Sequence, residues 1–211
     1  METLHSILIY IHIAAGIASL CFGFVPLVSK KGGKNHKKIG LLFYSSMFVV
    51  AITALLTSLY DGFTLLTHLG VFAIHLNYFG IRSLREKSMK SSPIDWGVNL
   101  LGLTNAVLMI TSGSVILIIF GIVSLSNVVS IIRLNIILMR NKPIPRLVWL
   151  SQHIGLMVGA YIATVTAFLV NNVRAMEPVW LLWILPTLVF IPLSLYWTFK
   201  YVRTPNKVAQ G

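Results

Sequence analysis

The chain has 211 residues, of which 56% are hydrophobic and only 10% are charged, and its mean hydropathy is +0.84. A water-soluble domain of this length needs a polar surface, so the composition excludes that class and predicts an integral membrane protein in contact with a lipid bilayer. The net charge of +12 does not predict nucleic-acid binding, because the basic residues are spread over short segments that flank apolar runs.

Seven apolar runs follow one another along the chain, and each is expected to form a transmembrane helix because the runs are continuous rather than alternating. They cover residues 4–28, 39–60, 64–83, 96–111, 114–138, 148–171 and 179–199. The small polar residues of Thr111–Ser114 predict a turn between the fourth and fifth runs, whereas an unbroken helix there would leave six spans. The predicted fold class is an all-α polytopic bundle, with one transmembrane domain over residues 1–211.

The loop charges decide between six and seven spans. Basic residues gather in four segments, namely Lys30, Lys31, Lys34, Lys37 and Lys38; Arg82, Arg85, Lys87 and Lys90; Arg140, Lys142 and Arg146; and Lys200, Arg203 and Lys207. Seven spans put all four on one side, which the positive-inside rule assigns to the cytoplasm, and leave Arg174 on the other. The N-terminus is therefore expected outside and the C-terminus inside. The first span lacks a basic start, so it is expected to remain as a helix rather than to be a cleaved signal peptide.

Five histidines lie within the predicted spans, four of them (His12, His68, His75 and His153) away from the outer edge where His5 lies. An ionisable group inside hydrocarbon indicates a functional site by default. His68 and His75 are seven residues apart on one face of the third helix, and Arg82 continues that face to the cytoplasmic end. His12 of the first helix is expected at a depth between His68 and His75. A cofactor between the first and third helices would then take one ligand from each.

The sixth helix carries a second polar face, formed by His153, Met157 and Tyr161 at a spacing of four residues. Its His153 and the third helix's His75 are expected to differ in depth by roughly 6 Å, which a tilted haem plane accommodates. Gly155 and Gly159 would allow close helix packing beside this face.

Three hypotheses for these histidines remain open at this stage. The first is b-type haem, ligated by two of His12, His68, His75 and His153, with Arg82 and the Lys30–Lys38 loop as candidates to bind the propionates. The second is a metal ion held by His12, His75 and His153, with Met157 favouring copper. The third gives each histidine only a hydrogen bond to a neighbouring helix.

The sequence also allows functions that do not depend on the histidines, such as a carrier or an assembly subunit. A redox or accessory role needs a partner protein, because the loops are too short to form a second domain. Polar residues of the fourth and fifth helices could line the cavity of a small-molecule carrier or could form interhelical hydrogen bonds; these are Asn99, Thr104, Asn105, Ser124, Ser126, Asn127 and Ser130. An assembly or structural subunit without cofactor is the other alternative. No catalytic constellation is recognisable, so enzymatic activity is left undecided.

Three motifs resemble a known family. They are His12-x-x-x-Gly16, the loop Lys31-Gly-Gly-Lys-Asn-His36-Lys-Lys-Ile-Gly40, and His153-Ile-Gly-Leu-Met157 followed by Tyr161-Ile-Ala-Thr. Together they are similar to bacterial membrane proteins that carry domain of unknown function 2306, and the similarity covers most of the chain. The resemblance implies a multi-pass protein of the bacterial inner membrane and singles out His12, His36 and His153 without assigning an activity. His36 could reach an interfacial site, although a histidine among lysines is more often solvated.

Overall fold

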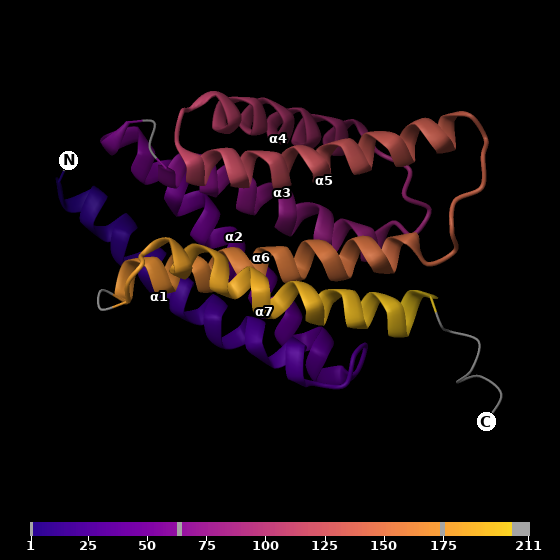
Figure 1. Cartoon of the computed structure of the whole chain (residues 1–211), viewed down its shortest axis with the longest axis horizontal. Coiled ribbons are helices and arrows are strands. Elements are labelled where there is room, and N and C mark those ends of the chain that lie inside the picture. The colour runs from indigo at the N-terminus through magenta and orange to yellow at the C-terminus, as the bar shows by residue number, and fades with distance from the viewer. Residues whose placement is uncertain (1, 63–64, 174–175, 204–211) are drawn as a thin grey trace.

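The computed structural model describes residues 2–62, 65–173 and 176–203, and over these residues it consists of seven α-helices and one π-helical turn (Figure 1). The helices are α1 (Glu2–Val28), α2 (Lys34–Asp61), α3 (Leu65–Arg85), α4 (Pro93–Thr111), α5 (Val115–Met139), α6 (Val148–Asn172) and α7 (Trp180–Thr198), and the π-helical turn η1 (Phe199–Arg203) extends α7. The all-α class and the seven predicted helices are confirmed. Residue 64, where the third span was predicted to start, lies outside the described residues, as do Arg174 and Lys207.

Six of these helices are long and apolar enough to cross a membrane, namely α1, α2, α4, α5, α6 and α7 with η1. Much of their apolar surface is exposed on the outside of the bundle, which fits contact with lipid. The chain therefore has the features of a multi-pass membrane protein. The exception is α3, whose apolar run is interrupted by His68, His75 and Asn77.

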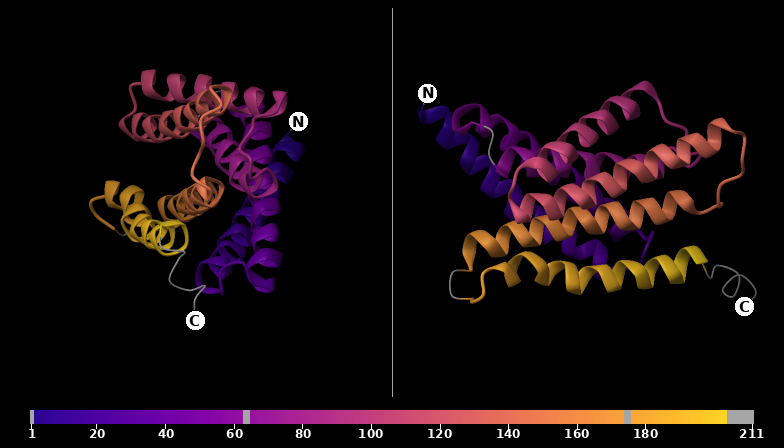
Figure 2. Two further views of the ribbon diagram at one scale, coloured as in Figure 1. Left: turned by 90° about the vertical axis from the view of Figure 1, so that its right-hand side faces the viewer. Right: turned by 45° about the horizontal axis from the view of Figure 1, so that its top comes forward.

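The polarity of α3 follows from its central place in the bundle. The hairpins α1–α2, α4–α5 and α6–α7 lie around it, and it packs mainly against α2, α4 and α6, with a smaller contact to α5 (Figure 2). Its buried residues include Phe72, Leu76 and Phe79 of the main core as well as His75 and Asn77. Since protein rather than lipid covers most of α3, its polar side chains find partners on neighbouring helices.

Small residues allow these helices to approach closely. A side chain at Gly70 would meet Ala54 and the carbonyl of Ala51 on α2, and one at Gly121 of α5 would meet the carbonyl of Ala106 on α4. With no large apolar driving force between helices in lipid, such close contact supplies much of the packing energy.

Two helices, α2 and α4, start three or more residues before the predicted boundaries. The α2 helix begins at Lys34 rather than at residue 39, because Gly33 takes an extended conformation at the N-cap and the lysines that follow can extend to water from the first turn. His36 therefore belongs to a helix and not to a loop. The α4 helix begins at Pro93, where the side chains and backbones of Ser92 and Asp95 form a capping box.

The predicted turn between the fourth and fifth spans is confirmed. The α4 helix ends at Thr111, Gly113 has a φ of 75° that favours glycine, and α5 starts after Ser114. This turn lies at the opposite end of the bundle from the loops that follow α3 and α5 (Figure 1).

Candidate functional site

An open cavity of about 790 Å³ lies at the end of the bundle that carries the basic loops, and we call it the basic cavity. Residues of α1, α2, α3, α6, α7 and the adjoining loops line it. Its apolar walls include Phe43, Ile81, Leu84, Trp149, Ile154, Tyr161, Trp197 and Tyr201. A concave, mostly apolar site with a few polar groups is the usual form of a small-molecule site.

All the charged side chains that line the basic cavity are cationic among the described residues. They are Lys31, Lys37, Arg85 and Lys87, and no carboxylate accompanies them. Lys87 places its ammonium 4.8 Å from the centre of the Trp149 ring, and Lys31 places its own 3.7 Å from the centre of the Trp197 ring. Aromatic rings thus hold two of the cations at the mouth of an apolar cavity.

Lys31 also closes the end of α1. Its ammonium donates to the carbonyls of Pro26 and Leu27, each at 2.6 Å, which are carbonyls that the last turn of a helix leaves unpaired. Burial lowers the pKa of the Lys31 amine to about 8. This lysine therefore changes charge much closer to neutral pH than an exposed lysine does.

Two histidines meet in the basic cavity, although 116 residues separate them in the chain. The rings of His36 on α2 and His153 on α6 have centroids 6.5 Å apart and lie at 73° to each other. Nδ1 of His36 is 3.2 Å from the carbonyl oxygen of Pro26, and Nδ1 of His153 is 2.9 Å from that of Gly80. Because a carbonyl only accepts, Nδ1 carries the proton in both rings, and in the neutral form of each ring Nε2 keeps a lone pair.

Gly80 explains how His153 reaches α3. A side chain at Gly80 would overlap the Met157 side chain, one turn after His153, so glycine at this position leaves the room that Met157 of α6 occupies against α3. Met157 and Tyr161 line the cavity with His153, as the predicted polar face of the sixth helix requires. The grouping of these three residues on one face is confirmed.

The structure does not bring His12 to the third helix, so that part of the sequence interpretation is wrong. Nδ1 of His12 is 2.9 Å from Oγ1 of Thr53 and 3.1 Å from the carbonyl oxygen of Val50, both on α2. The physical reason is that α2 packs against both α1 and α3, whereas α1 packs mainly on α2 and α6. His12 and His75 therefore belong to different helix interfaces.

The two histidines of α3 face α4. Nδ1 of His68 is 2.8 Å from Oδ1 of Asn105, whose amide in turn donates to the carbonyl of His68, and Nε2 of His75 is 3.0 Å from Oδ1 of Asn99. His75 also packs directly on Gly102. These contacts match the interhelical hydrogen bonds of the third hypothesis.

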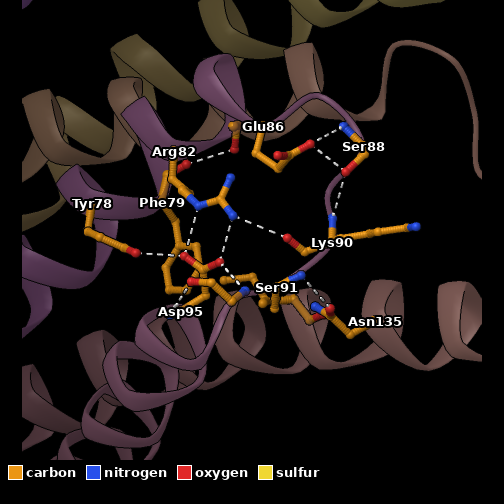
Figure 3. Close-up of polar contacts among 12 residues, drawn as sticks. Tyr78, Phe79, Arg82, Glu86, Ser88, Lys90, Ser91, Asp95 and Asn135 are labelled. Carbon is orange, nitrogen blue, oxygen red and sulfur yellow. Dashed lines mark hydrogen bonds and ion pairs between the residues drawn. The ribbon is translucent and has the colours of Figure 1, made fainter.

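Arg82 is not beside the histidines but in an ion pair, which corrects its predicted place near haem propionates. Its Nε and Nη2 atoms donate to the two carboxylate oxygens of Asp95 at 2.9 and 2.8 Å, and Tyr78 donates to the same carboxylate at 2.6 Å (Figure 3). The backbone amide of Ser92 completes the set at 2.6 Å. Because Asp95 is buried, this bidentate ion pair holds the Arg82 guanidinium between α3 and α4.

The described residues contain no group of three or more His, Cys, Asp or Glu side chains placed to hold a metal ion. The predicted set of His12, His75, His153 and Met157 is accordingly divided, with only His153 and Met157 in the basic cavity. The sequence interpretation missed two features: the pairing of His36 with His153, and the burial of Asp95. A signal for the first was present, because His36 was the only histidine in the basic Gly-Gly loop.

Comparison with protein families, curated proteins and solved structures found no match to this chain. The resemblance to the family with domain of unknown function 2306 therefore stays a prediction.

Proposed function

We propose that this protein binds an amphiphilic anion in the basic cavity, with the anionic head among the cations and the apolar body against the aromatic walls. The observation that carries the proposal is the set of four cationic side chains around an apolar cavity that no described carboxylate lines. Uncompensated positive charge at low local dielectric attracts a carboxylate or phosphate more strongly than it would in water. The cavity volume suits one molecule of that kind.

We further propose that the chain crosses a bacterial inner membrane seven times, with its N-terminus outside. In this proposal α3 also crosses the membrane and brings the six apolar crossings to seven. Its polar residues are tolerated there because the neighbouring helices, rather than lipid, surround it. The loops after α1, α3 and α5 and the end of α7 would then face the cytoplasm. In that orientation the basic cavity opens near the inner leaflet, where amphiphilic anions partition.

The haem and metal hypotheses remain proposals for this same cavity, supported by His153 and Met157. A redox-active occupant would require a partner protein to exchange electrons with it. A carrier or assembly role without a redox cofactor is the alternative, and it needs only the cationic, apolar character of the cavity.

The test is equilibrium binding of a fatty acid that carries a nitroxide spin label to the full-length protein in mild detergent. Wild-type protein should immobilise the label, and the double variant Arg85→Gln/Lys87→Gln should bind it about tenfold more weakly, because two of the four cavity cations are gone. The matched control is Arg140→Gln/Lys142→Gln, which removes the same charge from a basic loop that does not line the cavity. Equal loss in both double variants, or equal binding of the uncharged methyl ester, would contradict the proposal.

A further inference from the structure

We propose that His36 and His153 are the two axial ligands of a haem b that occupies the basic cavity. The inference rests on the proposed function, because haem is one amphiphilic anion with a planar apolar body and two carboxylates. It differs from the set expected from the sequence, since His36 replaces the histidines of α1 and α3.

The protonation of the two rings is the first support. In both, Nδ1 donates to a backbone carbonyl, of Pro26 for His36 and of Gly80 for His153. This is the outer hydrogen bond that fixes the tautomer and orientation of metal-binding histidines and makes Nε2 the ligand atom. A neutral imidazole in this tautomer offers its Nε2 lone pair to iron without losing a proton.

The separation of the rings is the second support. An imidazole centroid lies about 3 Å from a metal bound to its nitrogen, so two ligands on opposite faces of one iron have centroids about 6 Å apart. The centroids of His36 and His153 are 6.5 Å apart, and the rings are turned by 73°. The observed separation is therefore close to that of two imidazoles bound to one iron.

The number of protein ligands separates haem from a bare metal ion. A structural zinc site needs four protein ligands, and no third histidine, cysteine or carboxylate joins this pair among the described residues. A porphyrin supplies four nitrogen donors of its own, so two histidines complete the coordination of its iron. The cations Arg85 and Lys87 at the edge of the same cavity suit the two propionates.

The experiment uses full-length protein in mild detergent, titrated with ferric haem and followed by its Soret band. Wild-type protein should bind one haem with the spectrum of six-coordinate, low-spin iron. His36→Gln and His153→Gln should each weaken haem binding at least tenfold or convert the spectrum to a five-coordinate form. His12→Gln is the matched control, because its Nδ1 also faces a backbone carbonyl but the residue lies outside the cavity.

A second pair of variants guards against loss of folding. His36→Met and His153→Met keep an axial ligand, so they should retain haem and raise its reduction potential. Unchanged haem binding and spectrum in both Gln variants would overturn the proposal, as would a wild-type protein that binds copper or zinc in place of haem. If the spin-labelled fatty acid binds the cavity and haem does not, the haem inference fails while the proposed function stands.

Discussion

At the scale of single residues, the same side chain has different roles in different surroundings. Lys31 belongs to a loop of lysines, yet its ammonium donates to two carbonyls of α1 while lying over the Trp197 ring. Burial in that place lowers its pKa to about 8. Its charge is thus part of the basic cavity at neutral pH and is lost in mildly alkaline solution.

The first prediction concerns this lysine. As the pH rises through about 8, Lys31 loses its proton, one of the four cavity cations disappears, and affinity for the spin-labelled fatty acid should fall about threefold. The sign follows from the lowered pKa, because the charged form is present below that pH and the neutral form above it. Binding measured from pH 6.5 to 9 checks this, with Lys31→Arg as the control that keeps its charge. The same pH dependence in the arginine variant would contradict the assignment.

At the scale of helices, polar contacts determine which helices are neighbours. The α3 and α4 helices are joined near the basic end by the Arg82–Asp95 pair and further along by the contacts of His75 with Asn99 and of His68 with Asn105. Partners of this kind offset the cost of placing polar groups in a nonpolar bundle. These three contacts therefore fix how α3 and α4 are aligned along their length, which apolar packing alone would not specify.

A second prediction tests that interface. Asp95→Ala removes a buried carboxylate that accepts from Tyr78, Arg82 and Ser92, so the free energy of unfolding should fall by about 2 kcal/mol. Thermal unfolding in detergent measures the change. Glu86→Gln is the control, since that carboxylate is exposed and accepts only from Ser88 in a loop at the same end. An Asp95 variant as stable as the control would show that the ion pair adds nothing to the interface.

At the scale of the whole molecule, three hairpins pack around α3, so that the bundle has an apolar outside and a more polar interior. Large apolar side chains are exposed along the outside of the bundle, and polar side chains such as His75, Asn77, Asn99 and Asn105 are buried inside it. The loops that follow α1, α3 and α5 share one end with the C-terminal part of α7, so every described basic loop lies at that end. This arrangement is what the positive-inside rule requires of seven crossings.

The third prediction is the membrane topology. Reporter fusions at Asp61, Ser112 and Glu177 should report the outside, and fusions at Gly33, Lys90 and Lys142 should report the cytoplasm. The distribution of lysine and arginine is the physical reason, because positive loops are retained on the cytoplasmic side. A cytoplasmic signal at Ser112 would contradict the seven-crossing arrangement, in which α3 is one of the crossings.

The sequence by itself determined the helices, the turn at Gly113 and the concentration of positive charge, because each depends on neighbouring residues: continuous apolar runs, small polar breaks and clustered lysines. It also placed His153, Met157 and Tyr161 on one face, since helical periodicity is local. Only the tertiary structure decided that α2 separates α1 from α3, which removes His12 from the predicted cofactor set.

The pairing of His36 with His153 and of Arg82 with Asp95 was likewise decided by tertiary structure. Depth in the membrane can be counted along a helix, but the rotation of each helix and its choice of neighbour come from side chains far apart in the chain. Gly80 is the clearest case, because its missing side chain lets α6 approach α3 and brings His153 to the carbonyl that orients it. A single sequence contains that glycine but does not show which helix packs against it.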